Sequence, residues 1–335
     1  MGRYLVTGGC GFIGSHLVDT LLADGHSVRV LDNLSTGKRE NLAPAAELLV
    51  GDIRDQAAVA EAFEGVDGCF HLAAESSVAR CESDWLGAHA VNLTGTMMIF
   101  EQARRARSDR PVPVVYASSA AVYGDAATGP LSEEMPAHPI NAYGTDKAAC
   151  ELYAELAARR YGLPVIGLRL FNVYGPRQDP ASIYSGVISV FCARLSRNLS
   201  IDIYGDGGQT RDFIHVSDVV AYLERAMHSL SGGAGLYNVC TGESTSIRRL
   251  AETIADLTGV SLQIRFRPAR QGDIRRSAGN PARAVKHFDY RARTKLETGL
   301  RSVLSGSAVS GMAARRELET MDNHSNGGRN AGIQP

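Results

Sequence analysis

Tyr143 and Lys147 give this chain a candidate general base. The two residues are four apart at the start of a predicted helix, Thr145–Tyr161, and this spacing places both side chains on one helix face. A lysine ammonium beside a phenol stabilises the phenolate form, which can accept a proton from a hydroxyl group. The same pair is also common on ordinary amphipathic helices, so its meaning depends on the residues around it.

Ser118 and Ser119 follow directly after a predicted buried strand, Val112–Ala117. The carboxyl ends of the strands in an open parallel sheet form the edge at which ligands bind. A serine hydroxyl at this edge can donate to a substrate oxygen or relay a proton. The alternative is a turn serine that bonds only to its own backbone.

Three glycines, Gly8, Gly11 and Gly14, lie between a first predicted strand, Arg3–Thr7, and a first predicted helix, Ser15–Asp24. Glycine lets the backbone approach a pyrophosphate closely, and the N–H groups of the helix N-terminus meet its negative charge. The spacing differs from the usual G-x-G-x-x-G, so the dinucleotide interpretation depends on the flanking strand and helix.

Asp32 supports the same interpretation from the end of the second predicted strand, Ser27–Leu31. A carboxylate at this position accepts hydrogen bonds from the ribose 2′-hydroxyl and repels a 2′-phosphate. We therefore expect NAD, rather than NADP, as the cofactor.

Strand-like and helix-like stretches alternate through the first half of the chain, which indicates a βαβ series. The predicted strands are Arg3–Thr7, Ser27–Leu31, Glu47–Val50, Gly68–His71, Val112–Ala117 and Val165–Arg169. The predicted helices are Ser15–Asp24, Gln56–Phe63, Ala88–Arg107 and Thr145–Tyr161. The predicted fold class is therefore α/β, with a Rossmann-type doubly wound parallel sheet and a smaller α/β lobe.

The regular alternation ends near Tyr174. We predict an NAD-binding domain over residues 1–174, with some later segments returning to it, and a discontinuous nucleotide-sugar-binding lobe over residues 175–304. The elements predicted after residue 174 are Ser200–Tyr204, Val216–Ser229, Leu236–Val239 and Ser246–Thr258. Residues 305–335 are polar and glycine-rich, and we expect a flexible tail.

Composition excludes several classes of function. The net charge of −1 over 335 residues gives no surface for nucleic acid or acidic lipid. No run approaches the ~18 apolar residues of a membrane helix, and no secretory segment opens the chain. The six cysteines lack metal-type spacing, so we expect free thiols in a reducing cytoplasm and no metal site.

These motifs together resemble the extended short-chain dehydrogenase/reductase family, and within it the nucleotide-sugar 4-epimerases. The resemblance runs from Gly2 to about Leu304. The motifs that carry it occur in the family's order: the glycine turn, Asp32-Asn33-Leu34-Ser35-Thr36-Gly37, His71-Leu72-Ala73-Ala74, Ser118-Ser119, Tyr143-x-x-x-Lys147, Leu168-Arg169-Leu170-Phe171-Asn172-Val173-Tyr174-Gly175, Arg211-Asp212-Phe213 and Arg270-Gln271-Gly272-Asp273.

The resemblance implies an isomerase that inverts C4 of a UDP-hexose through a transient 4-keto sugar. Tyr143 would take the proton of the sugar 4-hydroxyl while NAD accepts the C4 hydride. Lys147 would hold the nicotinamide ribose, and Ser119 would bond to the sugar O4. The keto sugar would turn and take the hydride back on its other face, so that NAD stays bound and is recycled.

Further site residues are carried over from the same resemblance. Those expected to hold NAD are Gly8, Gly11, Phe12, Ile13, Asp32, Asn33, Ser35, Thr36, Gly37, Asp52, Ile53, Leu72, Ala73, Ala74, Ser76, Asn92, Ser118, Tyr143 and Lys147. Those expected to hold the UDP-sugar are Ser77, Ser119, Tyr143, Asn172, Gln178, Gly186, Val187, Tyr204, Arg211, Arg270, Asp273 and Ser277. Arginine forks suit a diphosphate, although each of these polar residues could also be an ordinary cap or surface ion pair.

Departures from the family pattern narrow the expected reaction. Related dehydratases and decarboxylases carry acidic residues where this chain has Ala120 and Ala121. This difference favours plain epimerisation.

Ser277 stands where glucose-specific epimerases have a bulky tyrosine, which leaves room for a larger sugar. UDP-glucuronate, UDP-N-acetylglucosamine and UDP-glucose all stay open as substrates. Asp179 stands where uronate epimerases have an arginine.

Two other functions stay open: a nucleotide-sugar decarboxylase or reductase, and a non-catalytic NAD-binding sensor.

The resemblance also implies a homodimer, formed by the predicted helices Ala88–Arg107 and Thr145–Tyr161. The apolar residues expected on their exposed faces are Met97, Phe100, Leu152 and Leu156. The alternative for these residues is burial in the core of one subunit.

Overall fold

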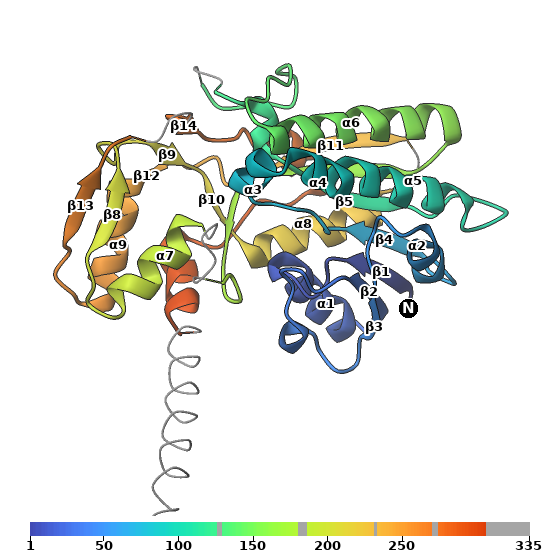
Figure 1. The fold of residues 1–335 in the computed structure, drawn as a ribbon, viewed down its shortest axis with the longest axis horizontal. Coiled ribbons are helices and arrows are strands. Elements are labelled where there is room, and N and C mark those ends of the chain that lie inside the picture. Colours follow the sequence, from blue (N-terminus) through green and yellow to red (C-terminus); the bar gives the residue numbers. More distant parts are fainter. Residues whose placement is uncertain (126–128, 180–185, 231–232, 270–273, 306–335) are drawn as a thin grey trace, which may run out of the picture.

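The computed structural model describes residues 1–125, 129–179, 186–230, 233–269 and 274–305 (Figure 1). Seven parallel strands form one sheet in the order β11-β6-β5-β4-β1-β2-β3. Their bounds are β1 Arg3–Thr7, β2 Ser27–Asp32, β3 Glu47–Val50, β4 Gly68–His71, β5 Val114–Ser119, β6 Val165–Leu170 and β11 Ala234–Val239. This sheet confirms the predicted α/β class, and its strand order reverses between β1 and β4, where a ligand crevice is expected.

Helices cover both faces of the sheet. The helices of this part are α1 Phe12–Ala23, α2 Gln56–Ala62, α3 Val78–Ser83, α4 Trp85–His89, α5 Thr96–Arg105, α6 Ala142–Tyr161, α8 Val216–Ser229 and α10 Ala282–Phe288. Successive strand residues serve opposite faces, as a pleated strand requires. In β1, Leu5 packs with α2, α5 and α6, whereas Val6 packs with α1 and α8. The near-continuous apolar runs of the strands follow from this burial on both sides.

The prediction of one continuous helix over Ala88–Arg107 is wrong. The chain forms α4, then a π-helical turn over Ala90–Gly95, and then α5. The carbonyl of Asn92 accepts bonds from Thr96 Oγ1 (2.6 Å) and Cys150 Sγ (3.2 Å). These side-chain donors accompany the local loss of the regular α-helical pattern, and such π turns often occur near functional sites.

Three elements beyond residue 174 lie with the main sheet: β11, α8 and α10, which packs against the other two. Strand β11 pairs with β6 along its full length, from Ala234 opposite Val165 to Val239 opposite Leu170. Helix α8 packs against α1, β5 and β6.

The smaller lobe lies at the carboxyl edge of the sheet (Figure 1). It contains β7 Asn172–Tyr174 paired with β10 Phe213–His215, β8 Ile201–Tyr204 paired with β13 Ile264–Arg267, and the short strands β9 Thr210–Arg211, β12 Thr245–Ser246 and β14 Arg276–Ser277. Its helices α7 Val187–Leu195 and α9 Ile247–Thr258 share a second apolar core. Short 3-10 turns occur at Arg39–Asn41 (η1) and Ala120–Tyr123 (η3).

All six cysteines are free and buried: Cys10, Cys69, Cys81, Cys150, Cys192 and Cys240. Within the described residues, no helix is long and apolar enough to span a bilayer. The same residues contain no cluster of three or more histidine, cysteine or acidic side chains that could hold a metal ion. The predicted tail lies outside the described residues from 306 onward.

Candidate active site

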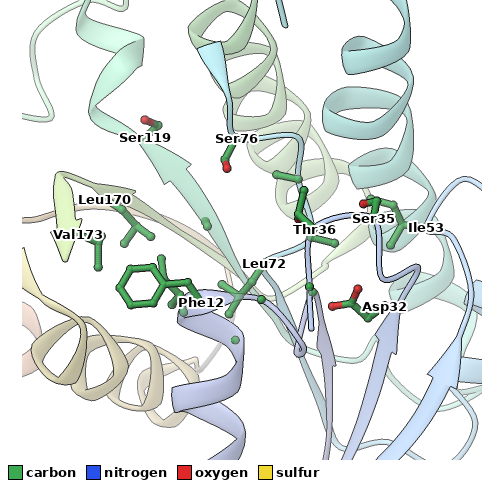
Figure 2. Close-up of a pocket in the computed structure, with 18 of the residues that line it drawn as sticks. Phe12, Asp32, Ser35, Thr36, Ile53, Leu72, Ser76, Ser119, Leu170 and Val173 are labelled. Carbon is green, nitrogen blue, oxygen red and sulfur yellow. The ribbon is translucent and has the colours of Figure 1, made fainter. Parts of the chain in front are cut away.

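A pocket of about 450 Å³ opens at the carboxyl ends of the parallel strands. Asp32 and Ile53 lie toward one end of it, whereas Ser119 and Leu170 lie toward the other (Figure 2). Most of the predicted site residues line it: Gly8, Gly11, Phe12, Ile13, Asp32, Asn33, Ser35, Thr36, Gly37, Ile53, Leu72, Ala73, Ala74, Ser76, Ser118, Ser119, Tyr143, Lys147, Gln178 and Gly186. The fold therefore brings the glycine turn, the acid and the tyrosine–lysine pair into one cavity.

The glycine turn forms a cradle with no side chains of its own. Gly8 has a left-handed backbone (φ +70°), and a Cβ on it would lie 2.8 Å from the backbone nitrogen of Ala73. A Cβ on Gly14 would lie only 2.2 Å from the carbonyl oxygen of Gly8. Helix α1 begins at Phe12, directly after the turn, and its first residues, Phe12 and Ile13, line the pocket, where the N–H groups of a helix N-terminus lack partners within the helix. This arrangement fits the pyrophosphate of a dinucleotide.

Asp32 places a fixed carboxylate at the other side of that cradle. Its side chain is buried and accepts bonds from the backbone N–H groups of Cys10 (2.9 Å) and Leu34 (2.8 Å). A Cβ on Gly37 would lie 2.9 Å from Asp32 Oδ2, so the loop after β2 closes tightly around the acid. A carboxylate held here accepts hydrogen bonds from the ribose hydroxyls of NAD and repels the 2′-phosphate of NADP.

Helix α6 brings Tyr143 and Lys147 to the pocket. The helix begins at Ala142, and the Asn141 side chain caps it by accepting from the N–H of Gly144 (2.8 Å). Lys147 is buried, donates from Nζ to the carbonyl of Ala117 (2.9 Å), and lies 5.8 Å from the centre of the Tyr143 ring. The ammonium is thus fixed between β5 and the tyrosine.

Ser119 is the last residue of β5 and lines the pocket. Its Oγ accepts from the N–H of Ala121 (3.1 Å), so this serine is also a turn residue. A Cβ on Gly144 would lie 2.6 Å from the carbonyl of Ala121, which shows how closely the first turn of α6 approaches the turn after Ser119. Ser119, Tyr143 and Lys147 therefore line the same part of the molecule.

The NAD dependent epimerase/dehydratase family profile matches residues 4–240 of this chain. The chain belongs to this family. UDP-glucose 4-epimerase of Mycolicibacterium smegmatis is 40% identical over 305 residues, which cover 89% of this chain and 96% of that protein. NAD is therefore the cofactor, as the glycine cradle and Asp32 predict.

Solved structures of similar proteins extend this likeness to three dimensions. UDP-glucose 4-epimerase from Thermotoga maritima, solved with UDP-glucose, matches with a TM-score of 0.88 and 34% identity, over 92% of this chain and 99% of that one. UDP-N-acetylglucosamine 4-epimerase from Methanobrevibacter ruminantium, solved with UDP-N-acetylmuramic acid, matches with a TM-score of 0.87, 34% identity and the same coverage.

Two residues that were predicted to contact NAD, Asp52 and Asn92, do not line the pocket. The Asp52 carboxylate bonds to Arg54 (2.7 and 2.9 Å) and to Asn33 Nδ2 (2.9 Å), and the Arg54 guanidinium holds its pKa well below the usual range. The Asn92 side chain is fully buried and bonds to the backbone N–H and carbonyl of Glu75 (2.9 and 3.0 Å). Asn92 thus supports the pocket wall at Ala74 from behind.

The residues predicted for the UDP-sugar are more dispersed. Gln178 lines the pocket and accepts from Ser189 Oγ at 2.6 Å, and Gly186 lies beside it before α7. Arg211 in β9 donates to the carbonyl of Ile274 (2.6 Å) and lies opposite Ser277 in β14. Arg270 and Asp273 lie outside the described residues.

Five other predicted sugar residues do not line this pocket, and Arg211 does not either. Asn172 Nδ2 donates to the Asp212 carbonyl (3.2 Å), and the Ser77 hydroxyl caps α3 by accepting from the N–H of Arg80 (3.1 Å). Val187 opens α7 and packs beside the core of the smaller lobe. The remaining two are Tyr204, at the end of β8, and Ser277.

Sequence reasoning missed pocket residues that have no reactive group. These are Leu31, Gly51, Ala117, Leu170, Phe171 and Val173, whereas Gly14 was recognised as part of the glycine turn. Most lie at or just beyond the carboxyl end of a strand, so the rule that ligands bind at this sheet edge would have found them. Glu151 and Arg169, which lie behind Ser118, were also not assigned to the site.

Proposed function

We propose that this protein is an NAD-dependent UDP-sugar 4-epimerase. The observation that carries the proposal is the shared pocket of Ser119, Tyr143 and Lys147, with the glycine cradle and Asp32 along the same cavity. The similarity to UDP-sugar 4-epimerases along nearly the whole chain supports it. The reaction is then an isomerisation with no net oxidation.

The residues present fit NAD in an extended pose. The Gly8–Gly14 turn would hold the pyrophosphate, Asp32 the adenosine ribose, and Lys147 the nicotinamide ribose. When bound, NAD supplies a reversible acceptor for the hydride of the sugar C4. Asp32 is already held by two backbone N–H groups, so its charge needs little rearrangement when the ribose arrives.

Tyr143 acts as the acid–base group in this proposal. Its phenol oxygen takes the proton of the sugar 4-hydroxyl and later returns it to O4, after the sugar has presented its other face. The Lys147 ammonium, fixed by the Ala117 carbonyl, stabilises the phenolate while it lasts. Ser119 Oγ donates to the sugar O4 and keeps that oxygen beside Tyr143.

Ala120 and Ala121 favour epimerisation over elimination or decarboxylation. Relatives of this chain include a UDP-glucuronic acid decarboxylase of Arabidopsis thaliana (31% identical) and a dTDP-glucose 4,6-dehydratase of Streptomyces niveus (33% identical). Loss of water requires a second proton donor beside the sugar. The two methyl side chains after Ser119 cannot supply one.

We propose a sugar larger than glucose as an accepted substrate, because Ser277 is small. Ser277 is buried beside Arg211 at the β9–β14 pairing. Asp179, which forms an ion pair with Lys38 (3.0 Å), stands where uronate epimerases have an arginine, so the side chain at this position supplies no cation for the carboxylate of a glucuronate. UDP-N-acetylglucosamine and UDP-glucose therefore rank ahead of UDP-glucuronate.

A substrate panel tests the proposed function directly. We expect the purified protein, without added NAD, to convert at least one of these three UDP-sugars to its 4-epimer, as resolved by chromatography. Retained NAD would turn over many equivalents of sugar because its oxidation state is restored in each cycle. Product that appears only with consumption of added NAD would indicate a dehydrogenase instead. A protein that binds NAD but converts none of the sugars would favour a sensor.

We also propose a homodimer through α4 and α6. Four large apolar side chains are exposed there: Trp85 (66%), Leu86 (71%), Leu152 (70%) and Leu156 (49%). Met97 is partly exposed at 38%, but the predicted exposure of Phe100 is wrong, because this ring is buried against Tyr116. Large apolar side chains left exposed on two helices that contact each other are typical of an interface.

Charge placed on this surface tests the dimer. We expect the double variant Leu152→Glu/Leu156→Glu to be monomeric by light scattering at micromolar concentration, while the wild type is dimeric. Leu199→Glu, at an exposed leucine (46%) before β8 in the smaller lobe, should leave the dimer intact. A wild type that is monomeric under these conditions would refute the proposed interface.

A further inference from the structure

A buried ion pair lies behind the serine end of β5. Glu151 of α6 and Arg169 of β6 form a two-pronged contact, with Nε–Oε1 at 2.9 Å and Nη2–Oε2 at 2.7 Å. Their side chains are only 10% and 4% exposed. Ser118 Oγ donates to the same Glu151 Oε1 at 2.5 Å. The pair therefore connects α6, β6 and the residue next to Ser119.

Glu151 continues the helix face that carries the tyrosine and the lysine. Tyr143, Lys147 and Glu151 are spaced by four residues, so they lie one above another along α6. Lys147 bonds to the carbonyl of Ala117, and Glu151 bonds to the hydroxyl of Ser118. Successive turns of α6 are thus bonded to successive residues of β5, directly before Ser119.

Arg169 also connects this contact to η3 and to the edge strand β11. Its guanidinium lies 4.7 Å from the centre of the Tyr123 ring in η3. The Tyr123 hydroxyl donates to Asn238 Oδ1 (2.7 Å), and Asn238 is the direct partner of Arg169 in the β6–β11 register. The network therefore fixes η3, which follows Ser119, as well as α6.

Stability alone is a poor reason for this arrangement. Taking both charges out of water costs several kcal/mol per ion, and a well-packed apolar pair is often as stable or more so. One guanidinium nitrogen, Arg169 Nη1, is buried without a hydrogen-bond partner among the described residues. A paired charge does, however, define one geometry, which an apolar contact does not.

We propose that Glu151 and Arg169 are positioning residues that set the distance between Ser119 on β5 and Tyr143 on α6. They touch neither the sugar nor NAD in this proposal, and they act through Ser118 and through the two elements they join. The proposal rests on the proposed 4-epimerase function, since that function gives the distance its importance. A displacement of about 1 Å between reacting groups can cost up to ~100-fold in rate.

The double variant Glu151→Leu/Arg169→Met tests the proposal, because it removes both charges and leaves no unpaired ion. We expect it to fold with a melting temperature close to that of the wild type and to keep its KM and its NAD affinity. We expect kcat to fall by at least about tenfold. Amide hydrogen exchange in the first two turns of α6 should become faster. A folded double variant with wild-type kcat and wild-type exchange would overturn the proposal.

A solvent-exposed ion pair of similar geometry in the smaller lobe provides the control. Arg265 and Asp202 form a similar two-pronged contact (2.8 and 3.1 Å) on β13 and β8, and their double variant Asp202→Leu/Arg265→Met should keep kcat. If the Glu151 and Arg169 double variant does not fold, Arg169→Lys keeps a positive charge beside Glu151 but removes the two-pronged contact. It should fold with a smaller fall in kcat, and unchanged kcat in it would overturn the proposal.

The same assays separate this proposal from the function it rests on. If the wild type converts no UDP-sugar, the proposed function fails and the positioning proposal fails with it. If the wild type is an active epimerase and the folded double variant is equally active, only the positioning proposal fails. A selective fall in kcat with unchanged KM supports both.

Discussion

Tyr143→Phe should remove epimerisation almost completely while it leaves the NAD-bound protein intact. The phenol oxygen is the proposed proton acceptor at the sugar 4-hydroxyl, and a positioned acid–base group contributes roughly 10²–10⁴-fold to a rate. We expect kcat to fall by about 10³-fold. Because phenylalanine keeps the ring that Lys147 approaches at 5.8 Å, the pocket should keep its shape. Product formation by chromatography and NAD affinity by calorimetry measure the two effects separately.

Tyr161→Phe is the matched control, since Tyr161 ends the same helix and is half exposed. This variant also loses a phenol oxygen, but at the end of α6 that is distant from Tyr143, and it should retain full activity. Substantial epimerisation by Tyr143→Phe would show that another group moves the proton. Loss of NAD binding in that variant would show that the tyrosine hydroxyl is needed to bind the cofactor, and the fall in kcat could not then be assigned to proton transfer.

The central strands could be predicted closely because each is a short apolar run buried on both faces, whereas the edge strand β3 is only partly buried. The bounds of β1 and β4 agree with the prediction, and β6 is longer by one residue. Residues 112 and 113, predicted as strand, precede β5, which instead continues to Ser119. A strand that ends in serines shows no apolar signal at its last two residues, although the ladder with β6 includes them.

The π turn and the buried ion pair could not be predicted from local pattern. In the π turn, the carbonyl of Asn92 accepts bonds from Thr96 and Cys150. Cys150 is distant in sequence, so a local pattern cannot reveal this contact. Glu151 and Arg169 are adjacent only because α6 packs onto the sheet between β5 and β6. Periodicity reports which face of an element is buried, but not which distant side chain it meets.

The reactive residues could be predicted for a different reason. Tyr143 and Lys147 share one helix, so their relative position follows from helical geometry alone. The polar residues of the smaller lobe come from separate short strands and loops, and their places depend on how these pack. Arg211, for example, uses Nη1 on the carbonyls of Thr210 and Ile274.

Gly14→Ala should abolish tight NAD binding with the addition of one methyl group. The new Cβ would lie 2.2 Å from the Gly8 carbonyl oxygen and 2.8 Å from the Gly9 Cα, and backbone atoms cannot rotate away as side chains do. The turn must therefore open, and its N–H groups leave the positions that suit a pyrophosphate. We expect a loss of about 3 kcal/mol, or roughly 100-fold in NAD affinity, measured by calorimetry.

Gly259→Ala separates this effect from general destabilisation. Gly259 ends α9 with a left-handed backbone (φ +67°) and open space around it, so alanine should cost about 1 kcal/mol of stability and no NAD affinity. If Gly14→Ala does not fold, Gly11→Ala places its Cβ at 3.1 Å from the same Gly8 oxygen and should weaken NAD binding less severely. Wild-type affinity in both turn variants would mean that the pyrophosphate is not held at this turn. The N-terminus of α1 would then have no part in cofactor binding, because the turn is what aligns its free N–H groups with the pocket.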